Sequence, residues 1–205
     1  IVNQNNLELP VIILNIGGIS NMTLINKDNK ISSLDIGPGN CLIDKWIRIN
    51  SNKNFDENGE IAKLGKVNQN ILNQSLENYY NSKISQNRSF NINDFDIHFV
   101  KGLSTEDGAA TLTDFTSKIL FKKIENKNVY LCGGGRKNMF LIKLLENKIN
   151  NKIKFIDELN INGDFVESQA FGYLAIRSFL KLPISYPETT GCKESCTGGE
   201  VVKNF

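Results

Sequence analysis

Two glycine loops, each at the end of an apolar run, are the clearest candidates for chemistry in this sequence. Gly17 and Gly18 follow the run Val11–Ile16, and residues 133–135 follow the run Asn128–Cys132. Glycine lets a backbone approach a phosphate group closely and turn its amide hydrogens toward it, and a helix N-terminus adds a favourable dipole. Either loop alone is also typical of a tight turn, and neither has Walker or Rossmann spacing.

Carboxylate and amide side chains near these loops could bind a ligand, but each also has a structural alternative. Asp35 could help to hold a magnesium ion, or it could merely cap the turn at Gly37 and Pro38. Asn40 could form hydrogen bonds to a ligand, or it could be the N-cap of the following helix. Glu167 could contact a substrate, or it could be a first-turn glutamate favoured by the helix dipole.

The basic and sulfur-containing side chains give weaker signals. Arg136 and Lys137 follow the second glycine loop and could neutralise phosphate, although basic residues in this position are more often solvated. His98, the single histidine, is not expected to be catalytic. The cysteines lack the spacing of a zinc site, and we expect them to be reduced thiols of a cytoplasmic protein; they are Cys41, Cys132, Cys192 and Cys196.

Composition excludes several classes of protein. The 205 residues are 40% hydrophobic and 22% charged, which is typical of a packed globular protein rather than a disordered one. The 24 basic and 22 acidic residues nearly balance, so the basic field that binds nucleic acid is missing. The longest apolar runs fall far short of the roughly 18 residues that indicate a membrane span.

The elements that must position these residues follow an α/β pattern. Apolar runs bounded by turn residues predict strands at residues 11–16, 20–25, 31–36, 128–132 and 152–156. Apolar residues at helical spacing predict helices at residues 41–47, 56–65, 67–80, 104–124, 138–148 and 164–181. Short turns join the first three strands into an antiparallel meander. We therefore expect one α/β domain, with a mixed sheet flanked by helices.

Three finer expectations concern the ends and faces of these elements. Ser104 and Asp107 should form an approximate capping box at the start of the long helix. Residues 200–202 could add a short closing strand. The apolar side chains of the last long helix could pack inward; they are Phe165, Ala170, Phe171, Leu174, Ala175, Phe179 and Leu180.

Taken together, five ordered motifs resemble those of the anhydro-N-acetylmuramic acid kinase family. They are Asn15-x-Gly17-Gly18-Ile19-x-Asn21, Asp35-x-Gly37-Pro38-Gly39-Asn40-x-x-x-Asp44, Gly133-Gly134-Gly135-x-x-Asn138, Val166-Glu167-x-x-Ala170-Phe171 and Thr190-Gly191. The resemblance runs from about residue 10 to residue 202, and the ordered set is far more specific than one glycine loop. The family belongs to the superfamily of sugar kinases, actin and chaperone ATPases. The resemblance therefore implies a ribonuclease H-like lobe with an antiparallel three-stranded meander in a mixed sheet.

The resemblance also implies two groups of site residues. The residues expected to bind ATP are Asn15, Gly17, Gly18, Asn21, Gly133, Gly134, Gly135 and Asn138. The residues expected to border the sugar are Asp35, Gly37, Gly39, Asn40, Asp44 and Glu167. Asn15 stands where the superfamily usually has an aspartate, so a magnesium ion must depend more on ATP and on other carboxylates, with Asp35 the nearest candidate.

The activity that the resemblance implies is a double one in peptidoglycan recycling. Water opens the 1,6-anhydro bond of anhydro-N-acetylmuramic acid, and the released O6 takes the γ-phosphoryl group of ATP, with Mg²⁺ as cofactor. We expect a cytoplasmic enzyme with an amino-sugar substrate and no nucleic-acid or membrane partner, and a homodimer is a further expectation. Two alternatives stay open: a non-catalytic nucleotide-binding module, or another sugar or acyl kinase of the superfamily.

The chain lacks two parts that the resemblance leads us to expect in the N-terminal part of such a kinase. These are the first phosphate loop and the aspartate base. We therefore expect residues 1–205 to be the C-terminal nucleotide-binding lobe of a two-lobed kinase, with a helical insertion at about 52–103 on the sugar side. The N-terminal lobe would be absent, the base would lie upstream of Ile1, and residues 1–205 alone should have little or no kinase activity.

Overall fold

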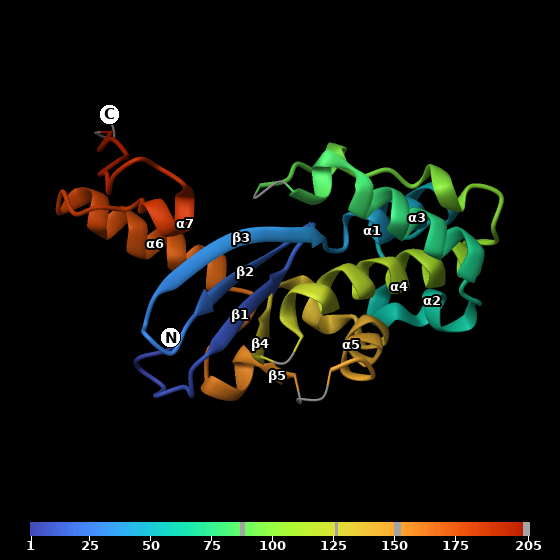
Figure 1. The fold of residues 1–205 in the computed structure, drawn as a ribbon, viewed down its shortest axis with the longest axis horizontal. Coiled ribbons are helices and arrows are strands. Elements are labelled where there is room, and N and C mark those ends of the chain that lie inside the picture. Colours follow the sequence, from blue (N-terminus) through green and yellow to red (C-terminus); the bar gives the residue numbers. More distant parts are fainter. Residues whose placement is uncertain (87–88, 126, 150–152, 203–205) are drawn as a thin grey trace.

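The computed structural model describes residues 1–86, 89–125, 127–149 and 153–202. Its centre is a mixed sheet of five strands in the order β3-β2-β1-β4-β5 (Figure 1). The strands are β1 Val11–Ile16, β2 Ile19–Ile25, β3 Ile31–Pro38, β4 Asn128–Cys132 and β5 Lys154–Phe155. The first three form an antiparallel meander, whereas β4 runs parallel to β1 and β5 parallel to β4. The predicted mixed sheet with its meander is confirmed. Residue 152, where the last strand was expected to begin, lies outside the described residues, and among residues 153–156 only Lys154–Phe155 form the strand.

Helices α4 and α5 pack on one face of this sheet, α1, α2 and α3 lie beyond one end of it, and α6 and α7 lie away from them on the other side (Figure 1). They are α1 Cys41–Asn50, α2 Glu60–Leu64, α3 Gln69–Asn81, α4 Thr105–Ile124, α5 Met139–Glu146, α6 Val166–Phe179 and α7 Pro187–Thr190. Short 3-10 helices connect them: η1 Glu57–Gly59, η2 Lys83–Gln86, η3 Ile92–Asp94, η4 His98–Val100, η5 Gly134–Lys137 and η6 Ile156–Leu159.

Helix α4 links two hydrophobic cores. Its C-terminal half, with Leu120 and Ile124, packs with α5 on the apolar face of the sheet. Its N-terminal half, with Leu112 and Phe115, packs into a second core made by α1, α3 and the loops around residues 95–100. Because neighbours surround the middle of α4 on nearly every side, even Thr111, Thr113 and Thr116 are buried. The sheet and the helical layer are therefore held by one continuous helix.

The start of α4 is fixed by polar contacts, but only half of the expected capping box forms. The Ser104 hydroxyl accepts a hydrogen bond from the Asp107 backbone N–H at 3.1 Å. The Asp107 carboxylate does not return to Ser104; it accepts the Lys66 backbone N–H at 2.7 Å instead. Asp107 therefore ties the loop before α3 to α4.

Close packing of α1 on α4 requires a glycine at position 108. The indole N–H of Trp46 donates to the Thr105 carbonyl at 2.8 Å, and a β-carbon on Gly108 would overlap the Trp46 ring. We expect Gly108→Ala to destabilise the fold by about 1–3 kcal/mol, because overpacking outweighs the better helix propensity of alanine.

Urea unfolding of the full-length protein measures this effect, and Gly172→Ala in α6 is the matched control. A β-carbon at Gly172 would meet no atom within 4 Å. The control should therefore unfold at an equal or slightly higher urea concentration. An unchanged midpoint for Gly108→Ala would mean that α1 does not pack on α4 in this way.

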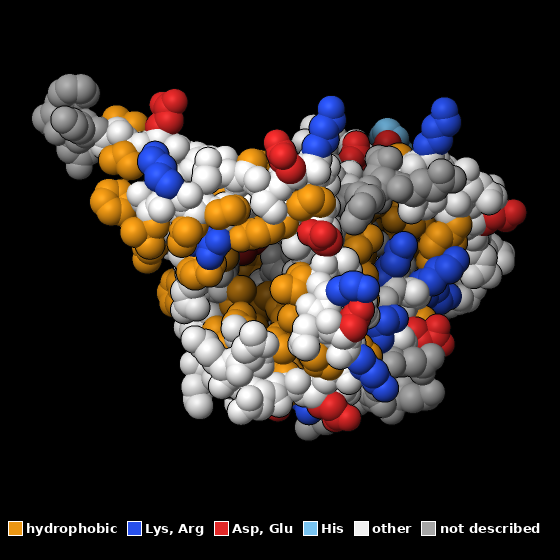
Figure 2. Space-filling view, turned by 60° about the vertical axis from the view of Figure 1, so that its left-hand side comes forward, with side chains coloured by type: hydrophobic (Ala, Val, Ile, Leu, Met, Phe, Trp, Pro, Cys, Tyr) orange, Lys and Arg blue, Asp and Glu red, His pale blue; other side chains and the backbone are white. Residues whose placement is uncertain are grey.

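Helix α6 corrects one expectation from the sequence. Its apolar side chains do not pack inward: no residue of α6 is buried, and Phe171 and Phe179 are 71% and 68% exposed. The helix extends along the side of the molecule toward the C-terminus (Figure 1), where apolar side chains gather on the surface (Figure 2). An apolar stripe identifies an amphipathic helix but does not say which element covers it.

The segment after α7 corrects a second expectation. Residues 200–202 form no strand, and Val201 and Val202 are 68% and 76% exposed. Instead, an antiparallel bridge joins Cys196, after α7, to Ser185, just before α7. None of the helices among the described residues has the length and apolar character needed to cross a membrane.

Candidate functional site

Three polar side chains form a row across the ends of the antiparallel strands. Asn15 pairs with Asn21, and Asn21 pairs with Asp35. Side chains at paired positions project from the same face of a sheet. Leu14 and Ile16, the neighbours of Asn15, enter the core under α4 and α5. Asp35, Asn21 and Asn15 therefore lie together on the opposite face, and we call them the polar row.

Glu167 joins this row from a distant part of the chain. The side-chain amide of Asn15 donates a hydrogen bond to Glu167 Oε1 at 2.8 Å. Glu167 lies in the first turn of α6 and is exposed. A favourable helix dipole alone would not explain a specific contact between residues 152 positions apart. The contact brings together one residue expected at the phosphates and one expected at the sugar.

The second glycine loop packs against the end of β1. Gly133 has a φ of 79°, and a β-carbon there would overlap the Asn15 side chain. A β-carbon on Gly135 would overlap Ile16. At Gly134, by contrast, a β-carbon would meet no atom within 4 Å. Two of the glycines thus permit close packing, whereas Gly134 faces open space.

The first glycine loop is bound to the turn that follows β3. The Gly17 carbonyl accepts the Asn40 backbone N–H at 2.8 Å, and the Gly18 carbonyl accepts the Gly39 backbone N–H at 2.9 Å. A β-carbon on Gly39 would overlap the Gly17 carbonyl oxygen. Asn40 occupies the N-cap position of α1, but its side chain accepts no capping hydrogen bond. Asn40 is therefore the N-cap residue of α1, as that alternative expected, but a capping role for its side chain is wrong.

Asp35 does not cap the turn at Gly37 and Pro38. Its Oδ2 atom accepts the backbone N–H of Phe90 at 2.8 Å, so this carboxylate holds the loop before η3. The capping alternative for Asp35 is also wrong. Among the described residues, no hydrogen bond engages the second carboxylate oxygen.

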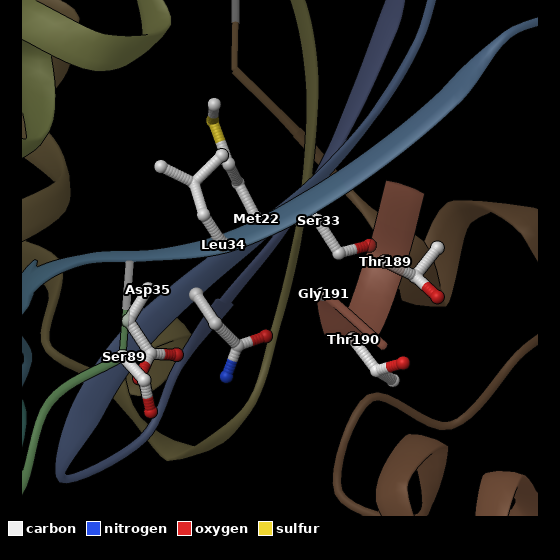
Figure 3. A pocket seen from close by; sticks show the side chains of 9 residues that line it. Met22, Ser33, Leu34, Asp35, Ser89, Thr189, Thr190 and Gly191 are labelled. Atoms are coloured by element: carbon white, nitrogen blue, oxygen red, sulfur yellow. The ribbon is translucent and has the colours of Figure 1, made fainter. Parts of the chain in front are cut away.

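A cavity of about 370 Å³ lies beside Asp35 (Figure 3). Asp35 and Ser89 stand on one side of it, and Thr190 and Gly191 stand on the other. The cavity therefore brings the Thr190-Gly191 motif next to the polar row, although 155 positions separate Asp35 from Thr190 in the sequence. Its lining residues are Asn21, Met22, Ser33, Leu34, Asp35, Ser89, Thr189, Thr190 and Gly191.

A second hollow of about 290 Å³ lies between α2 and the start of α5. Lys63, Glu60 and Asn58 border it on one side, and Met139 and Lys143 border it on the other. The hollow lies close to the second glycine loop, because α5, which borders it, begins at Met139. Sequence reasoning missed this hollow, because the two sides come from segments with no shared motif.

Asn138 and Asp44 lie apart from the polar row. Asn138 is only 6% exposed, and its side-chain oxygen caps α5 by accepting the Leu141 backbone N–H at 3.0 Å. Asp44 is half-buried in α1, and burial raises its pKa to about 6; Arg48 opposes this shift and Asp56 adds to it. Asp44 does not line the cavity.

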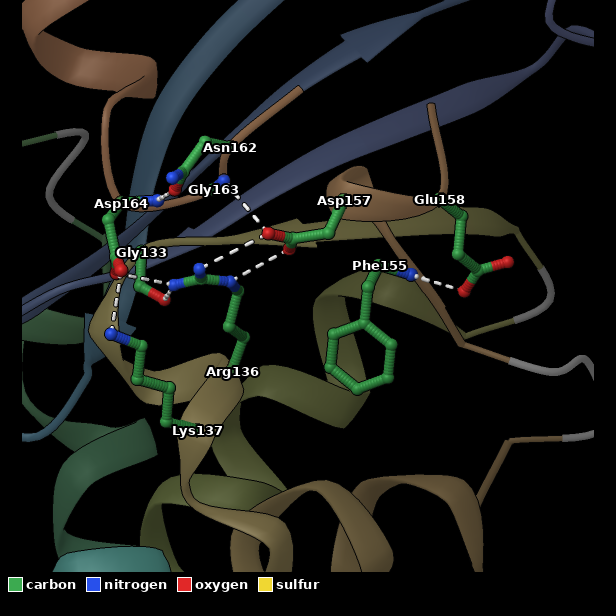
Figure 4. A network of polar contacts seen from close by, with 9 residues as sticks. All are labelled: Gly133, Arg136, Lys137, Phe155, Asp157, Glu158, Asn162, Gly163 and Asp164. Carbon is green, nitrogen blue, oxygen red and sulfur yellow. Dashed lines mark hydrogen bonds and ion pairs between the residues drawn. The ribbon is translucent and has the colours of Figure 1, made fainter. Parts of the chain in front are cut away.

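Arg136 is neither solvated nor free to bind phosphate. It is 8% exposed, and its guanidinium contacts two carboxylates and a backbone carbonyl (Figure 4). Lys137 is exposed and pairs with Asp164 at 2.7 Å. Both interpretations of Arg136 from the sequence are therefore wrong, because its partners lie 21 and 28 positions further along the chain.

The other titratable groups among the described residues form no metal site. No three His, Cys, Asp or Glu residues gather there in a group that could hold a metal ion. The four cysteines are free, and burial raises the pKa of the Cys41 and Cys132 thiols to about 11. His98 pairs with Asp96 at 2.5 Å on the surface, a partner that sequence reasoning overlooked.

Comparison with known proteins gives a consistent result. Residues 2–204 match the family described as anhydro-N-acetylmuramic acid kinase. The proteins of that name from Pelagibacter ubique and Zymomonas mobilis are 48% and 35% identical to this chain, over 100% and 94% of its length. The matches cover 58% and 54% of those proteins, so this chain spans about half the length of its curated relatives.

Solved structures give a weaker likeness. The activator of 2-hydroxyisocaproyl-CoA dehydratase from Clostridium difficile with bound ADPNP matches 78% of this chain and 57% of its own, at 16% identity and a TM-score of 0.46. The family match covers nearly the whole chain. The chain belongs to the anhydro-N-acetylmuramic acid kinase family.

Proposed function

We propose that the full-length protein uses ATP to open the 1,6-anhydro ring of anhydro-N-acetylmuramic acid and to phosphorylate its O6 atom. The product would be N-acetylmuramic acid 6-phosphate. Family membership supports this proposal, and one observation carries it further: the polar row leads from the two glycine loops to the cavity at Asp35. A nucleotide and a small polar substrate can therefore meet on one face of the sheet, at the ends of its antiparallel strands.

The nucleotide would lie along the two glycine loops. Gly134 offers an open stretch of backbone on which adenosine can rest, and the hollow beside α5 extends it toward Met139. The terminal phosphates would lie at Gly17 and Gly18, where Asn15 offers an amide. Asn138 would act indirectly here, because its side chain already caps α5.

Magnesium fits this site as an ion held mainly by the nucleotide. Mg²⁺ is usually bound through one or two carboxylates together with substrate phosphates. Two carboxylates are near enough to take part: Asp35 belongs to the polar row, and Glu167 contacts the row through Asn15. When bound, the ion would neutralise charge on the phosphates during transfer. This arrangement needs no dense group of acidic residues.

The amino sugar would occupy the cavity beside Asp35. A volume of about 370 Å³ lies within the range of small-molecule sites. Hydroxyl groups of Ser33, Ser89 and Thr190, together with the amide of Asn21, can form hydrogen bonds with ring hydroxyl and acetamido groups. These groups supply the hydrogen-bonding partners that a sugar needs in its site.

Opening the anhydro ring requires a base that takes a proton from water. A carboxylate held in position next to the substrate can do this. Within this chain, Asp35 is the acidic residue that lines the cavity, and one of its oxygens is anchored by Phe90. We therefore propose Asp35 as the base, in place of an aspartate upstream of Ile1. The proton would pass to Asp35 as the water oxygen attacks C1 and O6 is released.

An assay of the full-length protein tests the proposed function. ATP-dependent formation of a sugar phosphate is measured with anhydro-N-acetylmuramic acid, and with N-acetylglucosamine and acetate as control acceptors. We expect turnover with the anhydro sugar only. Turnover with a control acceptor alone would indicate another kinase of the superfamily, and ATP binding without any turnover would indicate a binding module. The cytoplasmic location and the homodimer stay predictions.

A further inference from the structure

Arg136 joins three separate segments of the chain around the second glycine loop (Figure 4). Its Nε and Nη2 atoms donate to the two carboxylate oxygens of Asp157 in η6, at 2.9 and 3.3 Å. Its Nη1 atom donates to the Gly133 carbonyl at 3.0 Å and to Asp164 Oδ1 at 2.7 Å. The guanidinium therefore holds the glycine loop, η6 and the loop before α6 in one arrangement.

Backbone contacts close the same arrangement. The Gly163 N–H donates to Asp157 Oδ1 at 3.2 Å, and the Gly163 carbonyl accepts the Gly133 N–H at 3.1 Å. A β-carbon on Gly163 would crowd the Arg136 guanidinium, so the arginine lies against this glycine. The loop that carries Asp164 is thus fixed to the second glycine loop through both backbone and side-chain contacts.

The charges in this group persist near neutral pH. Hydrogen bonds from Arg136, followed by that from Lys137, lower the pKa of Asp164 to about 2, and those from Arg136 also lower the pKa of Asp157. Removing a largely buried arginine would leave both carboxylates and the Gly133 carbonyl without this partner. The group is therefore sensitive to the loss of its central residue.

Helix α6 begins at Val166, two residues after Asp164, and its first turn carries Glu167. Glu167 reaches the polar row through its hydrogen bond with Asn15. No residue of α6 is buried, so packing against the rest of the described chain does little to fix the direction in which this helix starts. The Arg136 contacts lie where the helix leaves the sheet and can set that direction.

We propose that Arg136 is a positioning residue that places Glu167 against Asn15 by fixing the start of α6 on the second glycine loop. The expected effect on catalysis rests on the proposed function, whereas the placement of Glu167 does not. Lysine cannot replace the arginine, because a single ammonium group cannot bind Asp157 with two donors and also reach Asp164 and Gly133.

Kinetics of the full-length protein provide the first test. Arg136→Lys is expected to lower kcat for the anhydro sugar by about 10- to 100-fold, the scale of a displaced site group. In a Glu167→Gln background the same change should have little further effect, because Arg136 acts through Glu167. Arg48→Lys on α1, where the guanidinium makes its one hydrogen bond among the described residues to the Asn54 carbonyl at 3.2 Å, is the matched control. Additive losses in the double variant would overturn the inference.

Amide hydrogen exchange provides a second test that needs no turnover. Exchange of the peptide that contains the start of α6 should be faster in Arg136→Lys than in the wild-type protein, whereas Arg48→Lys should leave it unchanged. Unchanged exchange in Arg136→Lys would overturn the inference. If Arg136→Lys does not fold, Asp157→Asn removes one charged partner and should change exchange in the same direction. A wild-type protein that does not phosphorylate the sugar would contradict the proposed function, and the exchange result would still decide this inference.

Discussion

Replacing Asp35 with asparagine in the full-length protein is expected to lower kcat by about 10²- to 10⁴-fold, the usual contribution of a general base. Asparagine keeps the size of the side chain and can still accept the Phe90 N–H, so the loop before η3 should stay in place. It cannot take a proton from water. The measurement is the steady-state rate of ATP-dependent phosphorylation of the anhydro sugar, with kcat and KM determined separately.

The matched control is Asp28→Asn in the turn between β2 and β3. Asp28 is exposed, and its contacts are with Lys30, so this variant should retain the wild-type kcat. A raised KM with an unchanged kcat in Asp35→Asn would show that Asp35 only binds the sugar. In that case the base would have to lie elsewhere, as the sequence alone led us to expect.

The Gly134→Val variant is expected to raise the Kd for ATP at least about tenfold, equivalent to about 1.4 kcal/mol. The added side chain enters the open space at Gly134, where we place adenosine, but meets no atom of the protein within 4 Å at its β-carbon. The fold should therefore tolerate the change. Isothermal titration with ATP measures the Kd, and thermal unfolding verifies that the variant is folded.

Gly172→Val on α6 is the control for a β-branched residue in an equally open position. Its ATP affinity should equal that of the wild-type protein. An unchanged Kd in a folded Gly134→Val variant would mean that the second glycine loop is only a tight turn. Gly135→Val would not be a useful test, because its side chain would overlap Ile16 and disturb the fold itself.

The strands and the glycine loops could be predicted because their signals are local. Val11–Ile16 is a short apolar run that ends in glycine, and β1 begins and ends where that pattern indicates. The short turn between β2 and β3 then sets the pairing of Asn21 with Asp35. The polar row is therefore largely encoded in about 30 consecutive residues.

The contacts that complete the site could not be predicted from the sequence. Arg136 finds its partners in η6 and in the loop before α6, and Glu167 finds Asn15 at the far end of the chain. No local pattern identifies such pairs. The expectation that the apolar side chains of α6 pack inward failed for a related reason. Periodicity identifies the helix and its apolar stripe, whereas the element that covers the stripe depends on the rest of the structure.

The most direct test of this account is a crystal structure of the full-length protein with a non-hydrolysable ATP analogue and the anhydro sugar. We predict adenosine against Gly134, the terminal phosphates at Gly17 and Gly18, and the sugar within hydrogen-bond distance of the Asp35 carboxylate. A sugar bound away from the cavity, with no ligand atom in contact with Asp35, would contradict the account.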